Sequence, residues 1–385
     1  MSGTLRGKRV LLIGGTGPTG PLVVDGLLDR GAEVTVLNTG RRPATFAGDV
    51  ERIVADPHFL EPLETALGGR EFDIAIAQYG RLRLVAEVLA GRTERLIALG
   101  GMFYPGWIDP AATVRPSSET GVARDWSVTY LDEAAPVGER MPLEPVGGMG
   151  RRVVETDTDI RTRHQRGDFL ATLLRYPRVY GPGQLGAAEW SIVRRILEGR
   201  RRIILPEGGF LTSSVLYNEN AARIVLAACE RGDDFAGAVL NCADPDPITS
   251  RKWVRLIAEA LDAEVEIVSL PMELAELAWP YARFPLTAGH HILDTSELER
   301  RVSGLVPTAV GLQRTARWYA ADPAGRGESV EAQLKDPFDY ALEDRVLEAF
   351  DGLHDRIRSL GSPDLDMSHP YSHPTAPHVD GGARP

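Results

Sequence analysis

A glycine-rich stretch, GGTGPTG at residues 14–20, constrains the fold of this chain more than any other feature. It follows the apolar run RVLLIG directly and precedes a helix-forming segment. A G-x-x-G-x-x-G spacing permits a tight turn, close backbone approach to a pyrophosphate and close helix–strand packing, and the helix N-terminus attracts phosphates. A plain glycine turn is the alternative. The predicted cofactor-binding residues here are Gly14, Thr16, Gly17, Pro18, Thr19 and Gly20.

The first 100 residues alternate short apolar strands with helices. The expected strands are residues 9–14, 33–38, 52–56, 73–78 and 95–100, and the expected helices include 21–31 and 83–91. Strands rich in Val and Ile, with helices between them, indicate a parallel sheet covered on both faces. We therefore predict an α/β fold with a doubly wound parallel sheet of the Rossmann type.

The rhythm breaks at residues 102–146, which are rich in Pro, Gly, Ser and Thr and are expected to form a long loop. Regular elements return with helices at 149–165, 188–199, 220–232 and 250–262 and strands at 168–176, 202–206 and 238–243. A charged helix at 340–361 then leads into a tail rich in Pro and His.

Charge and composition argue against several classes of protein. The formal net charge of −11 disfavours a nucleic-acid surface, which is normally basic. No apolar run approaches the ~20 residues of a membrane helix, so no membrane contact is expected. Two cysteines show neither metal-ligand spacing nor a disulfide pattern, and a cytoplasmic location is the expectation. No metal site is predicted, because the tail histidines His369, His373 and His378 have no supporting Cys or carboxylate arrangement.

The end of the second strand bears on the choice of cofactor. NAD-binding sites usually place Asp or Glu here to hold the ribose hydroxyls, but this chain has Asn38, followed by Arg41 and Arg42. Guanidinium groups suit a 2′-phosphate, so NADP is the predicted cofactor and NAD the alternative. Solvated loop charges are the other interpretation of the arginines. Asp56, ending the third strand, would meet the adenine or cap a loop.

Three motifs together resemble the extended short-chain dehydrogenase/reductase family, the NAD-dependent epimerase/dehydratase group. They are GGTGPTG, RYPRVYGPGQ at 175–184 and SVLYNENAARIVLAACE at 214–230. The resemblance covers residues 8–320. It implies that Tyr176 and Pro177 pass close to the nicotinamide and that Gln78, Tyr79 and Gly80 lie against the cofactor.

The resemblance also implies a division of the chain. A Rossmann domain would comprise residues 1–182 plus 214–244, and a smaller α/β substrate domain residues 183–213 plus 245–320. Residues 321–385 would form a C-terminal helix and tail. Homodimers in this family often pair through the helices expected at 81–91 and 149–165. The second of these is unusually charged for such a seam, which weakens the expectation of a homodimer.

The family's chemistry depends on a Ser or Thr, a Tyr and a Lys, with tyrosinate as the acid/base. Anchoring on Tyr104 places Gly100 at the hydroxyl position. Anchoring on Glu155 places Arg151 at the lysine and Gly147 at the tyrosine. Arg151 would remain cationic near the ribose but is a poor proton donor, because its pKa is far above neutral. The usual catalytic set is therefore predicted to be replaced.

Other side chains are candidates for the missing functions. Tyr104, Tyr79 and Arg151 are the catalytic candidates, with packing as the alternative role for both tyrosines. The substrate-binding candidates are Arg178, Tyr180, His290 and His291. Arg178 stands where the family usually has Asn, and indicates an anionic substrate group or only a surface charge.

These observations favour an NAD(P)-dependent oxidoreductase or epimerase/dehydratase-like enzyme with non-standard acid/base residues. Its substrate would be a small molecule, such as a nucleotide-sugar-like compound or a secondary metabolite. One alternative is a non-redox isomerase, lyase or cyclase on the same scaffold. Another is a cofactor-sensing or RNA-binding protein, whose RNA-binding version the acidic charge disfavours.

Overall fold

The computed structural model describes residues 5–78, 80–102, 104, 129–130, 136–145, 147–278, 287–334 and 336–365. The candidate Tyr79 and the tail histidines lie outside these residues. The chain divides into two compact units, Met1–Asp336 and Pro337–Pro385. The domain division expected within the first unit stays a prediction.

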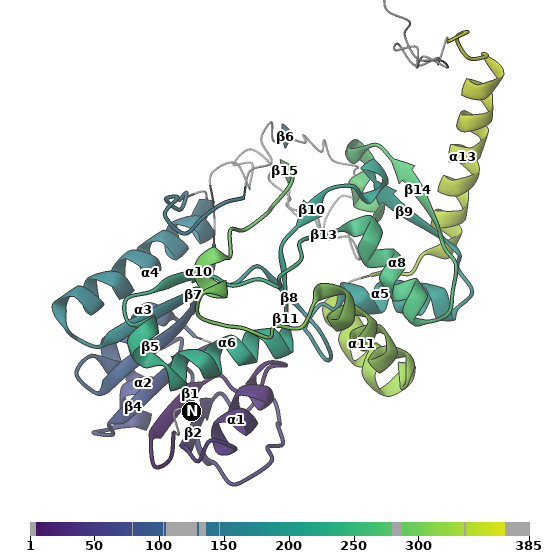
Figure 1. Ribbon diagram of the computed structural model, residues 1–385. Coiled ribbons are helices and arrows are strands. Elements are labelled where there is room, and N and C mark those ends of the chain that lie inside the picture. The colour runs from purple at the N-terminus through teal and green to yellow at the C-terminus, as the bar shows by residue number, and fades with distance from the viewer. Residues whose placement is uncertain are drawn as a thin grey trace, which may run out of the picture. The chain divides into compact units, whose positions relative to one another are not determined.

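A seven-stranded sheet forms the centre of the first unit (Figure 1). Its order is β12-β7-β5-β4-β1-β2-β3, and every pairing is parallel. The strands are β1 (Arg9–Ile13), β2 (Glu33–Asn38), β3 (Glu51–Val54), β4 (Phe72–Ala77), β5 (Thr93–Gly100), β7 (Leu170–Arg175) and β12 (Val239–Asn241). The strand order reverses between β1 and β4, and ligands of such sheets bind at this switch point. The predicted doubly wound sheet is confirmed.

Helices cover both faces of the sheet, as alternation along the buried strands requires. Val10 and Leu12 of β1 pack with α1 (Gly20–Leu28) and α6 (Asn218–Glu230), whereas Leu11 and Ile13 pack toward α2 (Leu60–Leu67), α3 (Leu82–Leu89) and α4 (Gly147–Arg166).

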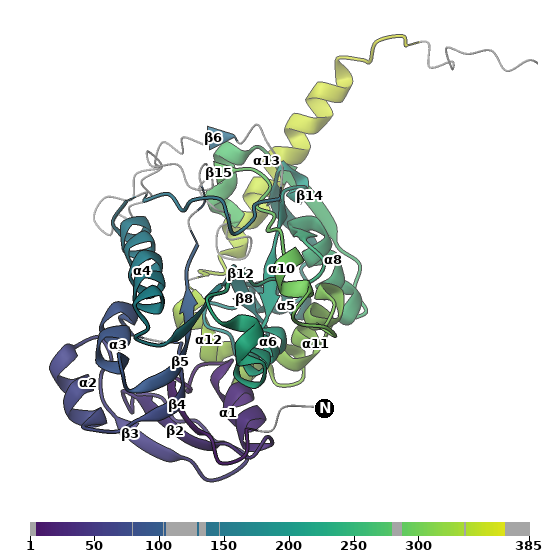
Figure 2. The same ribbon diagram turned by 60° about the vertical axis from the view of Figure 1, so that its left-hand side comes forward.

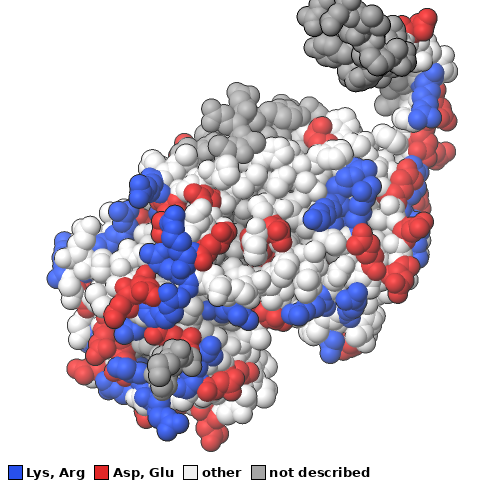
Figure 3. All heavy atoms as spheres, viewed as in Figure 1, with Lys and Arg blue, Asp and Glu red and all other residues white. Residues whose placement is uncertain are grey.

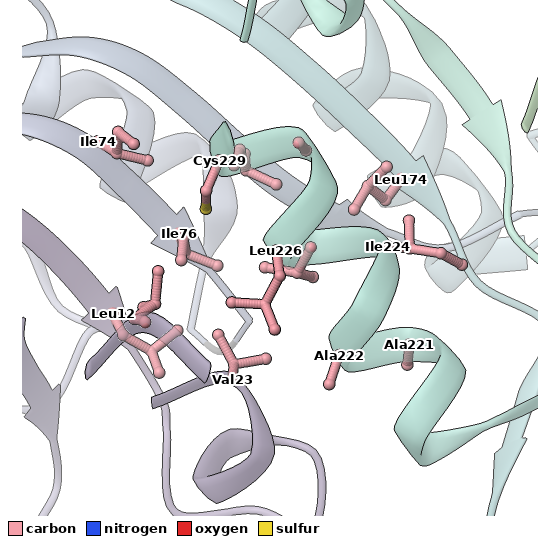
Figure 4. Packing of buried hydrophobic residues seen from close by; sticks show 14 of the residues in the cluster. Leu12, Val23, Ile74, Ile76, Leu174, Ala221, Ala222, Ile224, Leu226 and Cys229 are labelled. Atoms are coloured by element: carbon pink, nitrogen blue, oxygen red, sulfur yellow. The ribbon is translucent and has the colours of Figure 1, made fainter. Parts of the chain in front are cut away.

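Close packing on the first face depends on a glycine in α1. Leu226 of α6 lies near Val23 of α1 and Ile76 of β4 (Figure 4). A Cβ at Gly26 would lie 2.4 Å from Leu226 Cδ1, so this residue of α1 has no room for a side chain.

The second half of the first unit adds a layer beside the carboxyl edge of the sheet (Figures 1 and 2). Here β9 (Arg202–Pro206) pairs in parallel with β14 (Glu266–Leu270), beside α5 (Ala188–Leu197), α8 (Ser250–Ala260) and α11 (Thr308–Ala320). Between them and the sheet, β8 (Arg178–Tyr180) pairs in parallel with β11 (Val215–Tyr217). The sequence pattern did not predict α2, β8, β11, β14 or α11.

Short elements complete the described chain. They are β6 (Thr129–Tyr130), η1 (Glu207–Gly209), β10 (Thr212–Ser213), α7 (Gly232–Phe235), β13 (Ile248–Thr249), η2 (Met272–Ala278), β15 (Thr287–Ala288), α10 (Ser296–Glu299), η3 (Pro323–Gly327) and α12 (Glu328–Leu334). The second unit contains α13 (Tyr340–Ser359), whose N-terminus is capped by the Asp339 carboxylate accepting from Leu342 N. In the part of the chain that the structure describes, every helix is too short or too polar to cross a membrane.

Acidic and basic side chains lie beside one another over much of the face shown in Figure 3. This face therefore carries both signs of charge, although the formal net charge of the chain is −11. The expectation that nucleic acid is not a partner stays a prediction, because no partner is present.

Candidate functional site

The glycine loop has the geometry of a phosphate cradle. Gly15 has φ of +70°, a conformation that favours glycine. A Cβ at Gly20 would lie 2.3 Å from the carbonyl carbon of Gly15, so the start of α1 packs directly on the loop. A Cβ at Gly17 would have no atom within 4 Å. The loop is therefore closed on its protein side and open at Gly17, where a ligand would approach.

The N-terminus of α1 suits an anion. Its N-cap residue, Thr19, makes no side-chain cap hydrogen bond, and its first turn holds no acidic residue. The partial positive charge of the helix end is therefore not neutralised by the helix's own side chains. Thr16 and Pro18 belong to the same loop, as predicted from the sequence.

The ends of β2 and β3 lie beside the glycine loop at the carboxyl edge of the sheet. Asn38 is buried, and its Oδ1 accepts from Gly40 N at 2.7 Å, so this side chain closes the turn that leads to Arg41 and Arg42. Both arginines are exposed. The pKa of Asp56 is lowered, chiefly by the hydrogen bond from His58 and also by the charge of Arg41. Arg41 is thus close enough to Asp56 for their charges to interact, and His58 is a member of this edge that the sequence did not indicate.

Gln78 brings a buried amide donor to the same end of the sheet. Its backbone N–H donates to Ile13 O at 3.0 Å, which places it beside β1 at the switch point. Its side-chain Nε2 is buried and has no hydrogen-bond partner among the described residues. Buried amide groups are rarely left without partners, so a ligand acceptor at this position would satisfy it. Gly80 follows, where a Cβ would meet Pro57 Cβ at 2.7 Å.

The three positions of the family's catalytic set lie on two elements. Gly100 ends β5 and Gly147 begins α4. Arg151 is exposed on α4, and Glu155, one turn later, forms an ion pair with Arg83 of α3 at 2.9 Å. Neither glycine has a side chain, and a guanidinium is a poor acid. At these three positions the chain therefore offers no group that transfers protons near neutral pH.

The catalytic candidate Tyr104 lies in a buried polar network. Its hydroxyl donates to Asn241 Oδ1 at 2.5 Å and accepts from Arg175 Nη1 at 3.1 Å. Burial raises the pKa of Tyr104 above its ordinary value. This is the wrong direction for a tyrosinate base near neutral pH, so the geometry favours the packing alternative for Tyr104.

Arg175 joins this network to α4. Its Nη2 donates to Asp157 Oδ2 at 2.7 Å, and the two side chains are only 3% and 9% exposed. Arg175 Nη1 also donates to Glu139 O at 3.2 Å. The sequence contained Arg175 in a recognised motif, but the partner on α4 depends on helix orientation and was missed.

The remaining predicted residues lie at the carboxyl edge or in the added layer. The Tyr176 hydroxyl donates to Ala221 O of α6 at 3.3 Å, so this side chain is engaged within the protein. Tyr176 and Pro177 directly follow the end of β7. Tyr180 is buried and donates to Asp244 Oδ2 at 2.8 Å, which indicates a structural role. Arg178 is partly exposed.

The two histidines are held through the strand-like segment that they share. His290 Nδ1 accepts from Thr212 N at 3.1 Å. The buried His291 pairs with β10 through its backbone, with His291 N donating to Thr212 O and Ser214 N donating to His291 O, both at 2.8 Å. Their role in substrate binding stays a prediction. Among the described residues, His, Cys, Asp and Glu side chains form no group that would hold a metal ion.

No family model matches the chain. Solved structures share its fold. A UDP-galactose 4-epimerase has a TM-score of 0.57 at 17% sequence identity, over 82% of this chain and 99% of that one. A dTDP-glucose 4,6-dehydratase from Bacillus anthracis in complex with NAD has a TM-score of 0.61 at 14% identity, over 83% and 98%. The chain therefore shares the fold of this epimerase and this dehydratase.

Two further similarities bear on function. The enzyme WbmH from Bordetella bronchiseptica in complex with NAD+ has a TM-score of 0.59 at 13% identity, over 82% of this chain and 99% of that one. A 3-diazoavenalumate denitrifying reductase from a Streptomyces species is 28% identical over 261 residues, which are 66% of this chain and 82% of that protein.

Proposed function

We propose that this protein is a reductase that uses NADP(H) to reduce a small molecule without a proton-donating tyrosine. One contrast carries the proposal: the glycine loop is intact, whereas the positions of the proton-transfer set hold Gly100, Gly147 and Arg151. Epimerisation through a hydroxyl group requires proton transfer at that oxygen, so the loss of the set disfavours it.

The residues at the sheet edge fit a dinucleotide. The loop around Gly17 and the N-terminus of α1 would hold the pyrophosphate, and the buried Gln78 amide would donate to the cofactor. Arg41 and Arg42 would contact a 2′-phosphate, since no carboxylate ends β2. The NAD complexes of similar folds support a nicotinamide dinucleotide, and the choice of NADP rests on the two arginines.

The chemistry of the similar reductase suggests why a proton donor is dispensable. Its name describes removal of nitrogen from a diazo compound. A bound nicotinamide would supply a hydride with its electron pair. A diazonium group would leave as N2 with the C–N electron pair, so the carbon would gain hydrogen without protonation of any oxygen. Binding and orientation are then the tasks left to the protein's own side chains.

The proposal is tested by mixing the purified protein with NADPH and an arenediazonium salt. We expect reduced-nicotinamide absorbance to fall in step with N2 release and arene formation, faster than in a reaction without protein. Product formed without net cofactor consumption would instead favour the non-redox alternative. Failure to bind either NADPH or NADH would refute the proposal.

The cofactor choice has its own test. The R41A/R42A variant should bind NADPH at least about tenfold more weakly and NADH nearly as well as before, since only the 2′-phosphate contact is lost. Equal losses for both cofactors would contradict the assigned role. The R52A variant is the control. Arg52 lies on the neighbouring strand β3, where it stacks on Phe46 and donates to Ala44 O, so its removal should leave binding of both cofactors nearly unchanged.

A further inference from the structure

Arg178 lies just beyond the carboxyl edge of the central sheet. It begins β8, three residues after Arg175 ends β7 at the carboxyl edge of the sheet. Figure 1 shows β8 and β11 between this edge and the layer that contains α5 and α8. In open α/β sheets the crevice outside the carboxyl ends of the strands is where ligands bind.

Two buried groups hold the guanidinium of Arg178. Its Nη2 lies 3.4 Å from Oε1 of Glu189, whose side chain is 1% exposed on the first turn of α5. Its central carbon lies 5.0 Å from the centroid of the Trp253 ring on α8. Trp253 is in turn fixed by an edge-on contact with Tyr180, at 5.0 Å between ring centroids. An arginine stacked and paired in this way loses little further freedom on binding a ligand.

The Arg178 side chain is nevertheless 31% exposed, so the contacts with Glu189 and Trp253 do not remove it from solvent. A guanidinium presents five N–H donors in a rigid plane, and the Glu189 contact is made by one of its nitrogens, at a long distance. A carboxylate approaching the exposed edge would form the charge-assisted, bidentate contact that arginine favours. An isolated surface charge would need neither the buried carboxylate nor the tryptophan platform.

We propose that Arg178, held by Glu189 and Trp253, binds a carboxylate group of the substrate. The inference rests on the proposed function, because it names the substrate class of that same site: organic anions that carry a carboxylate. Arg178 is here a binding residue, and Glu189 and Trp253 position it.

The binding test uses a non-reducible pair of probes. Calorimetry compares 4-hydroxycinnamate with 4-hydroxycinnamamide in the presence of NADP+, so that the probes differ in the carboxylate alone. The wild-type protein should favour the carboxylate by about tenfold or more, and R178M should lower this preference to about one. R178K should retain part of it, because charge remains while the fork and stacking are lost.

Two further variants separate ligand binding from structure. R326M removes an arginine that also stacks on a tryptophan, Trp318 at 4.6 Å, with 38% of its side chain exposed; it should keep the wild-type preference. E189Q removes the charge of Glu189 but retains an oxygen that can accept from Arg178, so it should keep the wild-type preference. If Arg178 served only to neutralise Glu189, wild type and R178M would show equal preferences, and the inference would be overturned.

A turnover test distinguishes this inference from the proposed function. If the protein favours 4-hydroxycinnamate through Arg178 but consumes no NADPH with either benzenediazonium or 4-carboxybenzenediazonium, the carboxylate site stands and the proposed chemistry fails. If both salts are reduced with equal kcat/KM in wild type and no probe preference exists, the proposed chemistry stands and the carboxylate site fails.

Discussion

Individual glycines of the first unit differ in what a side chain would meet there. At Gly20 a Cβ would overlap the backbone of Gly15, whereas at Gly17 it would enter open space. The first glycine is therefore needed for folding of the loop, and the second only for the approach of a ligand. This difference allows cofactor binding to be tested separately from stability.

We expect Gly17→Ala to weaken NADPH binding by about tenfold or more while leaving the thermal midpoint of the free protein nearly unchanged, because the methyl group would occupy the path of the pyrophosphate. Fluorescence titration and thermal melts measure the two quantities. Gly69→Ala is the matched control, since Gly69 also has no atom within 4 Å of a Cβ; it should change neither. Unaltered NADPH binding by Gly17→Ala would rule out the loop as the phosphate site.

A second residue-level prediction concerns pH. Burial raises the pKa of Asp244, although its carboxylate accepts from Tyr217 N, Asn220 Nδ2 and the Tyr180 hydroxyl. The folded state therefore holds this proton more tightly than the unfolded state, and the resulting stability is lost as pH rises through the folded pKa. Asp244→Asn retains an amide oxygen and does not titrate.

Relative to wild type, Asp244→Asn should gain free energy of unfolding as pH rises from the ordinary pKa of an aspartate through the raised pKa of the folded protein, because the wild-type carboxyl loses its proton over that range. Urea unfolding at a series of pH values measures this difference. A constant difference between the two proteins across that range would contradict a raised pKa for Asp244.

At the scale of elements, α4 is the helix that carries Gly147 and Arg151, the positions where the family resemblance would place a tyrosine and a lysine. Its first turns hold glycines and arginines, yet it is fixed to the sheet by the buried pair of Asp157 and Arg175. The helix also carries many charges, and with α3 it lines a hollow of ≈ 1000 Å³ that Arg152, Asp159 and Arg163 share with Asp157. Such a charged surface suits a buried dimer seam poorly, so the homodimer stays a prediction.

Removing one partner of the buried pair should cost far more than removing a comparable exposed one. Asp157→Ala leaves the Arg175 charge without its carboxylate, and we expect a loss of about 3 kcal/mol in the free energy of unfolding. Asp159→Ala, which removes an ion pair with Arg163 on the more exposed side of the same helix, should cost less than about 1 kcal/mol. Denaturant titration compares the two; similar losses would show that the buried pair does not anchor α4.

At the scale of the whole molecule, the chain consists of two compact units that meet in sequence at Asp336 and Pro337. The first unit contains the sheet, its hydrophobic clusters and the proposed cofactor site. Asp336 itself belongs to this unit, where it pairs with Arg195; the two side chains are 0% and 3% exposed. A truncated chain should therefore end at Asp336, so that this ion pair is kept.

A chain ending at Asp336 should fold and bind NADPH with an affinity within about threefold of the full chain, because every residue assigned to the cofactor is retained. A chain ending at Leu334 should be less stable by about 3 kcal/mol, since it lacks the carboxylate that pairs with the buried Arg195. Circular dichroism melts and NADPH titration provide the comparison. If the chain that ends at Asp336 failed to bind NADPH, the second unit would contribute to the site.

The sequence by itself determined the sheet and the glycine turn after its first strand, because both depend on local patterns. Continuous apolar runs rich in Val, Ile and Leu specify strands that are buried on both faces, and the glycine spacing specifies the turn between β1 and α1. The loss of the catalytic set could also be read directly, since residues 143–157 contain no Tyr or Lys in any register.

Only the tertiary structure decided the roles of the polar side chains. Tyr104 and Tyr180 looked like candidates for the site, but folding buries their hydroxyls in hydrogen bonds with Asn241 and Asp244, far along the chain. The contacts of Arg178 with Glu189 and Trp253, on which its proposed role rests, also arise only in the folded chain. The physical reason is that a side chain's pKa, burial and partners depend on residues distant in sequence, whereas strand periodicity and turn chemistry depend on near neighbours.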